Sequence, residues 1–297
     1  MKRWWYCVLI VLVSVIVACG TGKPGKDLNR EGPFGSTQDG FSNSHSEHNT
    51  TDTYPYTHYQ SLPDSFLQHM PWGLPYDSDT SDDFLIFRSQ YILSYNTLKG
   101  GPNWVMWYLH PEDYGTAGRH SGNFMPDPLL PDSLFIALHR DFTHSGFDRG
   151  HMVRSHERTA TRAHNLSTFF MTNILPQTPD LNRGVWLDFE RHCENLCLKE
   201  SRHLLIVAGG VYQTPRSLSS QEAILIPDSL FKLVYSLPLS VSFHEPDTSL
   251  RVYAVMMPNT QGIRRDPWTK YARPPASLSE RSGYTLFPLK PGLKYNE

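Results

Sequence analysis

The segment SGFDRGHMVR, residues 145–154, gathers one acid, two arginines, two glycines and one histidine in an otherwise weakly charged chain. Arg149 offers a planar guanidinium that suits a phosphate or a carboxylate, and His151 is a side chain that exchanges a proton near neutral pH. Gly150 allows a tight turn or the close approach of a ligand to the backbone. The segment therefore favours an anionic ligand and a proton transfer. The alternative is a turn with a surface ion pair between Asp148 and Arg149 and a histidine buried in the core.

A second group of polar residues follows in FFMTNILPQTPDLNRGVWLDFE, residues 169–190. Apolar residues here and beyond recur at spacings of three and four, which predicts a helix over residues 182–200. Asn182 and Glu190 then fall roughly on one face of that helix. Hard oxygen ligands, with water molecules completing an octahedron, are the usual environment of Mg²⁺ beside a phosphate. A histidine base, a phosphate-facing arginine and a Mg²⁺ ligand together predict phosphodiester hydrolysis.

These motifs resemble the DNA/RNA non-specific endonucleases, the group of bacterial sugar-non-specific nucleases and mitochondrial endonuclease G, whose active site is a ββα-metal finger. The three motifs are D-R-G-H at Asp148–His151, T-N-x-x-P-Q at Thr172, Asn173, Pro176 and Gln177, and L-N-x-x-x-W-x-x-x-E at Leu181, Asn182, Trp186 and Glu190. Flanking segments extend the match over roughly residues 84 to 290. Several motifs in the right order make a coincidence implausible.

The resemblance implies a role for each central residue. His151 would be the general base that activates the attacking water, and Arg149 would contact the phosphate and stabilise the developing charge of the transition state. Asn182 would be the direct protein ligand of Mg²⁺, and Glu190 would reach the metal through a water molecule; Mn²⁺ accepts the same ligands. The metal would stabilise the leaving 3′-oxygen, so that the products carry 5′-phosphates.

The resemblance also implies supporting and substrate-binding residues. The residues expected to position the loop or the metal's water molecules are Asp148, Asn173 and Gln177. The residues expected to bind substrate are Arg149, Arg119 and Arg183. The chain departs from the family upstream of the first motif, because members often carry an arginine directly before the Asn of that segment and this chain has Gly122 before Asn123. Arg119 either reaches the same phosphate or that contribution is lost.

The rest of the chain is rich in strand signals. Apolar, often β-branched runs bounded by Gly, Pro, Asn or Asp predict strands. They occupy residues 83–96, 103–110, 202–212, 223–227, 230–237 and 251–259. With the helix over residues 182–200 and the family resemblance, they predict a mixed α+β domain with a central, largely antiparallel sheet and a ββα-metal (His-Me finger) active-site element.

The first residues have the composition of an export signal. A charged start and an apolar run over residues 4–18 predict a signal peptide over residues 1–19, and IVACG at residues 16–20 resembles a lipobox. Cys19 would then carry the lipid; an ordinary signal peptide or anchor is the alternative. Residues 20–69 hold few aliphatic side chains and predict a disordered tether to an endonuclease domain over residues 70–297. The expected location is a bacterial cell envelope, with lipid anchoring in the outer membrane.

Two cysteines lie outside the export segment. Cys193 and Cys197, with His192, would supply three zinc ligands at most. Both lie on the apolar stripe of the predicted helix, so buried small apolar side chains are the better interpretation.

The charge of the chain is close to neutral, at a formal −2, which argues against a protein that coats nucleic acid. Residues 149–216 nevertheless hold nine Arg or Lys against six acids, and a basic excess suits a phosphate backbone. Alternatively, Arg154, Arg158 and Arg162 are a solvated face.

These features predict a Mg²⁺-dependent nuclease that acts on DNA and RNA without sequence specificity. The first alternative is a non-catalytic nucleic-acid-binding or structural envelope lipoprotein, and a further one is the same chemistry on a smaller phosphodiester. Because a binding module needs no base, His151 together with Asn182 and Glu190 favours the enzyme. The oligomeric state stays open, a homodimer included.

Overall fold

The computed structural model describes residues 62–218 and 220–286. The expected signal peptide with its lipobox, Cys19, most of the expected tether and residues 287–297 lie outside the described residues. Within the described ranges, no helix has the length and apolar character needed to cross a membrane.

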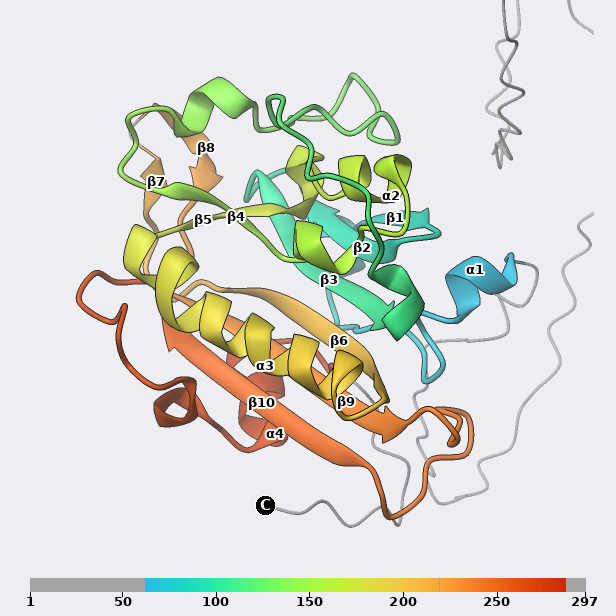
Figure 1. Cartoon of the computed structure of the whole chain (residues 1–297). Helices are drawn as coiled ribbons and strands as arrows, with labels where there is room; N and C mark the ends of the chain where they lie inside the picture. The colour runs from blue at the N-terminus through green and yellow to red at the C-terminus, as the bar shows by residue number, and fades with distance from the viewer. Residues whose placement is uncertain (1–61, 219, 287–297) are drawn as a thin grey trace, which may run out of the picture. The chain divides into compact units, whose positions relative to one another are not determined.

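A six-stranded antiparallel sheet forms the centre of the fold (Figure 1), in the order β1-β2-β3-β6-β9-β10. Its strands are β1 (Phe84–Arg88), β2 (Tyr91–Asn96), β3 (Gly101–Leu109), β6 (Arg202–Val211), β9 (Ser229–Pro238) and β10 (Arg251–Pro258). All six match segments expected from the sequence. The remaining segment, expected over residues 223–227, forms β8 (Gln221–Leu225), which pairs with β7 (Ser217–Leu218) in a small separate sheet. The expected α+β fold with a largely antiparallel sheet is confirmed.

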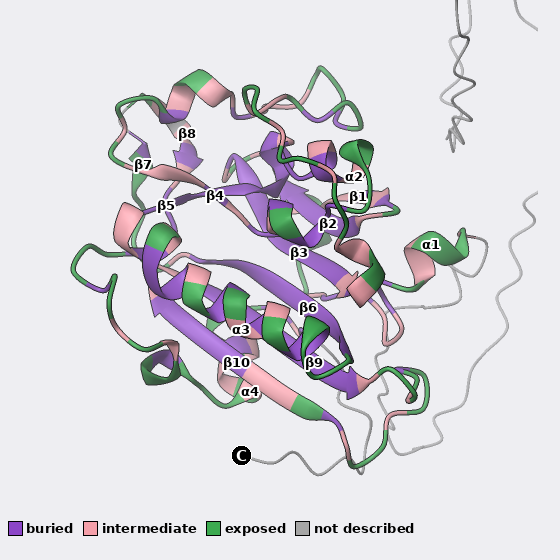
Figure 2. Ribbon diagram, viewed as in Figure 1, coloured by how far each residue is buried: buried purple, intermediate pink, exposed green. Residues whose placement is uncertain are grey.

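The sheet is buried on both faces, which explains why its strands read as long apolar runs. In β6, Leu204 and Ile206 belong to one apolar cluster, whereas Leu205 and Val207 belong to the other, as the alternation of side chains in a strand requires. The long helix α3 (Trp186–Leu198) packs on the first face, and the short helix α4 (Pro275–Ser282) supplies Leu278 to the second. Figure 2 shows the continuous burial of the central strands.

A hairpin and the helix that follows it make the ββα element of the fold. Strand β4 (Asp148–His151) pairs antiparallel with β5 (Ile174–Gln177), and the chain between them carries the short helix α2 (Arg162–Ser167). Asn259 anchors the end of β5, since its side chain donates to the carbonyl of Pro176 at 2.9 Å and accepts from the amide of Thr178 at 2.8 Å. These bonds tie the end of the hairpin to the residue that follows β10.

The start of the site helix differs from the expectation of one regular helix from residue 182. A π-helical turn occupies Leu181–Val185, and Gly184 within it has non-helical angles of φ −121° and ψ −113° before α3 begins at Trp186. A Cβ atom on Gly184 would lie 2.6 Å from the Cα and the carbonyl oxygen of Arg264. The backbone around Arg264 therefore needs a glycine here, and its approach accompanies the interruption of the helix.

The described fold also includes residues that the sequence assigned to the tether. Helix α1 (Asp64–Leu67) lies within residues 20–69, and Leu67 packs against the second apolar cluster. His69 is buried and accepts a hydrogen bond from the amide of Tyr108 at 2.9 Å through Nδ1.

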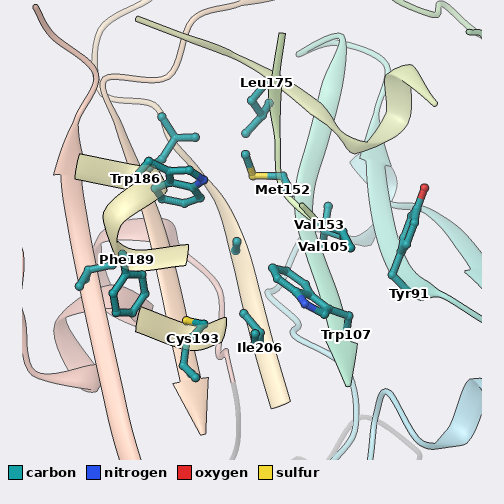
Figure 3. Packing of buried hydrophobic residues seen from close by; sticks show 14 of the residues in the cluster. Tyr91, Val105, Trp107, Met152, Val153, Leu175, Trp186, Phe189, Cys193 and Ile206 are labelled. Carbon is teal, nitrogen blue, oxygen red and sulfur yellow. The ribbon is translucent and has the colours of Figure 1, made fainter. Parts of the chain in front are cut away.

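Both cysteines of α3 are free thiols in the core, on the apolar stripe where the spacing placed them. Figure 3 shows Cys193 on α3 close to Ile206 of β6, below Phe189 and Trp186 on the same helix. Burial raises the pKa of the Cys193 thiol and raises that of Cys197 to about 12. These thiols therefore stay protonated and pack as small apolar side chains.

Candidate active site

The imidazole of His151 stands at the end of β4 in an aromatic surround. Its ring lies 5.1 Å from that of Phe124 and 5.0 Å from that of Phe169. Burial, and then the positive charge of Arg119, lower the pKa of His151 to about 3. Its Nε2 is buried and has no hydrogen-bond partner among the described residues. The ring is therefore neutral at physiological pH, which a proton acceptor requires.

His151 lines a hollow of about 400 Å³ together with residues from three other segments. Arg119 reaches it from the loop upstream of β4, Ser155 and Arg154 from the chain after β4, and Glu190 from α3. The structure thus brings together three of the residues expected from the sequence, His151, Arg119 and Glu190, on one surface large enough for a phosphodiester.

Arg119 is held against the wall of this hollow. Its guanidinium lies 4.8 Å from the ring centre of Phe169, and it donates a hydrogen bond to the hydroxyl of Ser155. Burial, and then the nearby charge of Arg154, lower the pKa of Arg119, whereas Glu190 raises it. An arginine therefore lines the His151 hollow although Gly122 stands where the family often carries one.

Glu190 is a buried carboxylate between two cations. Its Oε2 lies 3.5 Å from Nε of Arg154, and its Oε1 lies 3.6 Å from Nζ of Lys232. Arg154 also donates to Glu194 at 2.7 Å. The two cations offset the cost of burying the Glu190 charge and hold the carboxylate in one place.

Lys232 is a part of the site that the sequence reasoning missed. It shares one face of β9 with Leu230 and Val234, which belong to the apolar cluster that α3 covers, so its side chain points under α3. Its Nζ lies 4.4 Å from the ring centre of Trp186 and 5.4 Å from that of Trp107, the two indoles seen in Figure 3 on α3 and β3. Both contacts favour a cation in a desolvated place. The signal in the sequence that could have identified Lys232 was a single lysine inside an otherwise apolar predicted strand, over residues 230–237.

Glu157 lies beside Trp107 and is fully buried. Its Oε2 accepts a hydrogen bond from Nε1 of Trp107 at 2.9 Å. Burial raises the pKa of Glu157 to about 7, against the opposing charge of Lys232 and with a further contribution from Glu190. The sequence offered no pattern that identified this acid.

Asn182 belongs to a second network, centred on Asp148. Its Nδ2 donates to Oδ2 of Asp148 at 2.9 Å, and the same oxygen accepts from Nε of Arg183 at 2.7 Å. Asp148 is therefore the acid that joins the hairpin to the turn before α3. Asn182 is not among the residues that line the hollow with His151, and the guanidinium of Arg183 is held by a carboxylate.

The donor atoms fit a divalent cation of the hard class. The Nδ2 hydrogen bond to Asp148 orients the Asn182 amide, and its Oδ1 accepts no hydrogen bond from any described residue. Such an outer hydrogen bond is the usual way in which a ligand is positioned. Among the described residues, no group of three or more His, Cys, Asp or Glu is arranged to hold a metal, so a cation here would depend on the amide oxygen, few carboxylates and water, as Mg²⁺ often does.

Arg149 points away from the hollow. Its guanidinium donates to the carbonyl of His139 through Nε at 3.1 Å and to the hydroxyl of Thr143 at 3.0 Å. It lies 6.0 Å from the ring centre of Phe124, and Arg149 does not line the hollow that contains His151. Its contact with a phosphate stays a prediction.

Of the expected supporting residues, Asn173 holds the hairpin by hydrogen bonds and Gln177 packs inside it without a side-chain hydrogen bond to a described residue. Asn173 donates to the carbonyls of Val153 and Thr168 at 3.0 and 2.9 Å and accepts from the amide of Val153 at 2.9 Å. Gln177 is fully buried, and a Cβ atom on Gly150 would lie 2.3 Å from its Cδ. The glycine of D-R-G-H is therefore required by the packing of Gln177.

The arginines after β4 have different environments, so they are not one solvated face. Arg158 is buried and donates to the carbonyls of Gln90 and Tyr108, each at 2.8 Å, which is a structural role. Arg154 lines the hollow, and Arg162 on α2 is exposed.

The hairpin of β4 and β5 and the helix α3 that follows it have the arrangement of the ββα-metal nucleases. The chain belongs to the DNA/RNA non-specific endonuclease family, whose model matches residues 74–292. This match confirms the family expected from the sequence. Members of this family are nucleases, that is, hydrolases that bind nucleic acid, and this part of the expectation is confirmed with it.

Relatives agree with this assignment, and a solved structure agrees with the fold. The chain is 38% identical to a protein named Nuclease from Nostoc sp. over 206 residues, which cover 69% of this chain and 73% of the relative. It is 28% identical to the human protein named Nuclease EXOG, mitochondrial, over 67% of this chain and 56% of the relative. A crystal structure of the EndoG/EndoGI complex contains a chain that matches with a TM-score of 0.66 at 22% identity, over 79% of this chain and 97% of that chain, which supports the fold.

Proposed function

We propose that this protein is a metal-dependent endonuclease that hydrolyses phosphodiester bonds of DNA and RNA without sequence specificity. The observation that carries the proposal is the neutral imidazole of His151, whose Nε2 has no partner among the described residues and which lines one hollow with Arg119 and Glu190. A protein that only binds nucleic acid has no need of such a group.

The chain's own residues divide the work of the reaction. His151 accepts the proton of the attacking water, because its lone pair is free at physiological pH. Arg119, on the wall of the same hollow, binds the scissile phosphate and stabilises the charge that develops on it. Arg154 and Lys232 hold the carboxylate of Glu190 in place from its two sides.

A divalent cation, Mg²⁺ or Mn²⁺, would be held by Oδ1 of Asn182 and, through water, by Glu190, and would supply charge stabilisation at the leaving 3′-oxygen. Asp148 orients the Asn182 amide for this purpose. The products would carry 5′-phosphates and 3′-hydroxyls.

The test is degradation of plasmid DNA and of RNA by the purified chain with Mg²⁺, with EDTA, and after His151→Ala. Loss of both polymers that needs the metal and vanishes in the variant would support the proposal. Intact polymers at high protein and metal concentration would instead favour a non-catalytic nucleic-acid-binding or structural lipoprotein on the same scaffold.

We also propose that the protein is exported and anchored in a bacterial cell envelope by a lipid on Cys19, at the outer membrane. The proposal is based on the lipobox-like residues 16–20. Metabolic labelling with a fatty-acid analogue should mark the wild-type chain and leave Cys19→Ala unlabelled, and equal labelling of the two would contradict the anchor.

A further inference from the structure

A second hollow, of about 520 Å³, adjoins the one that contains His151. It is lined by Gly118, Arg119, His120, Ser121, Arg162, Ala163 and Leu166. Arg119 lines both hollows, so a ligand that extends beyond the His151 hollow past this arginine enters the second one.

The second hollow carries positive charge without a balancing acid. None of its lining residues is acidic. Arg162 is exposed and forms no ion pair within residues 62–218 and 220–286, and the contacts of Arg119 are a neutral hydroxyl and an aromatic ring. The guanidinium of Arg162 is therefore available for an anion, beside Arg119, which the proposed function assigns to the scissile phosphate.

The opposite situation holds in a third hollow, of about 340 Å³, which shares Arg154 and His156 with the His151 hollow. Arg154 and His156 lie 2.7 and 3.4 Å from carboxylate oxygens of Glu194. Arg191, which also lines it, lies 3.1 Å from Asp188. The two arginines on this side are each paired with a carboxylate, so the net attraction for a polyanion is concentrated on the side of Arg162.

The walls of the second hollow are formed before any ligand arrives. The amide of His120 donates to the side chain of Asn165 on α2 at 2.8 Å, and Asn165 in turn donates to the carbonyl of Ser155 at 2.7 Å. The amide of Ala117 donates to the carbonyl of Thr159 at 3.0 Å. These bonds tie the loop that carries Arg119 to the helix that carries Arg162, and such preorganisation lowers the entropic cost of binding.

We propose that this second hollow, between residues 118–121 and α2, is a subsite that binds a backbone phosphate of a nucleotide next to the one that is cleaved. The inference rests on the proposed nuclease function and deepens it. A polynucleotide presents a second phosphate beside the scissile one, whereas a small diester does not. The subsite therefore selects polymers over small phosphodiesters, and Arg162 is its principal cation.

The test compares Arg162→Ala, Arg162→Lys and Arg162→Glu in the full chain. Arg273→Ala is the matched control, since Arg273 is exposed and hydrogen-bonds the carbonyls of Lys270 and Ala272 in its own loop. The substrates are a DNA oligonucleotide and bis(p-nitrophenyl) phosphate, and KM is measured over a range of NaCl concentrations. Equilibrium binding of a fluorescent oligonucleotide in EDTA provides a second readout that needs no turnover.

We expect Arg162→Ala to raise KM and Kd for the oligonucleotide about threefold to tenfold, and to lower the slope of log Kd against log salt by about 0.7 to 0.9, the value for one lost phosphate contact. The ratio of kcat/KM for the oligonucleotide to kcat/KM for the small diester should fall by the same factor. Arg162→Lys should retain most of the wild-type affinity for the oligonucleotide because lysine keeps the positive charge. Arg162→Glu should lose more affinity than Arg162→Ala because it places a negative charge in the subsite.

An unchanged salt slope in Arg162→Ala would overturn the subsite, as would an equal loss on both substrates or a loss at least as large in Arg191→Ala. If the wild-type chain cleaves neither substrate, the proposed function fails, but the binding measurement still decides whether Arg162 contacts a phosphate.

Discussion

The Nζ of Lys232 lies 3.6 Å from Oε1 of Glu190, and both side chains are buried between the central sheet and α3. The contact joins a strand late in the chain to the carboxylate expected at the metal site. Lys232 has no hydrogen bond to a described residue through Nζ, so its charge is stabilised by Glu190 and by the two indole rings.

Replacing Lys232 with Met should lower both stability and activity. The change leaves a buried carboxylate with one cation fewer, which costs about 3 kcal/mol of unfolding free energy, and loss of such a positioning contact lowers activity about tenfold or more. Urea unfolding and plasmid cleavage measure the two effects. The control is Lys270→Met, which removes an exposed pair with Asp266 and should change little. Equal behaviour of the two variants would contradict the prediction.

The pKa of His151 should shape the acid side of the activity profile. Because burial lowers this pKa to about 3, the imidazole stays neutral as pH falls through 6.5, and kcat/KM should not decline there on account of histidine protonation. The same shift in pKa affects stability. Below the unfolded pKa of about 6.5 the unfolded chain binds a proton that the folded chain excludes, so the free energy of unfolding falls as the pH is lowered from 6.5 towards 3. The measurement is a profile of kcat/KM from pH 4 to 8 for the wild type and for the residual activity of His151→Ala. A decline of the wild-type kcat/KM centred near pH 6.5, with no such decline in the variant, would refute the prediction.

Glu157 should make stability depend on pH in the opposite sense. Its folded pKa of about 7 is raised above the unfolded value of 4.5, chiefly by burial. Its contribution is therefore complete below pH 4.5 and is lost as pH rises through 7, a change of up to about 3 kcal/mol. Glu157→Gln keeps an acceptor for Trp107 but removes this dependence. The free energy of unfolding, measured with urea at pH 5 and at pH 8, should rise in the variant relative to the wild type at the higher pH. The same difference between the two proteins at both pH values would argue against the prediction.

Asp148 should act on the metal through Asn182. Asp148→Ala removes the hydrogen bond that orients the Asn182 amide, so the Mg²⁺ concentration for half-maximal activity should rise about 10- to 100-fold. Arg183→Ala removes only the other partner of Asp148 and serves as the control. A titration of activity with Mg²⁺ distinguishes the two, and a similar shift in both variants would assign the effect to the hairpin as a whole.

Gly150 and Gln177 should be energetically coupled. A Cβ atom on Gly150 would lie 2.3 Å from Cδ of Gln177, which is buried, so Gly150→Ala should cost about 1–3 kcal/mol through overpacking. Gly150→Ala combined with Gln177→Ala should cost less than the sum of the two single changes, as thermal unfolding of the four proteins would show. Strict additivity would mean that the two positions do not compete for space.

Local patterns in the sequence accounted for much of the fold. Apolar runs between turn residues located the strands of the central sheet, with β1 and β2 inside one predicted run, and the apolar stripe located α3 with Cys193 and Cys197 on its buried face. These predictions succeeded because the strand and helix periods depend only on neighbouring residues. The prediction of a regular first turn was wrong: a π-helical turn stands there, at the place where the backbone of Arg264, a distant segment, approaches Gly184.

The sequence by itself therefore determined the family, the strands of the central sheet, the long helix and the identity of His151, Asn182 and Glu190 as candidates. The tertiary structure decided which charges are balanced and which are free: it buried Lys232 against Glu190, and left Arg162 exposed beside the hollow. The physical reason is that the energy of a charge depends on its burial and on its partners, and both are set by segments that meet only when the chain is folded.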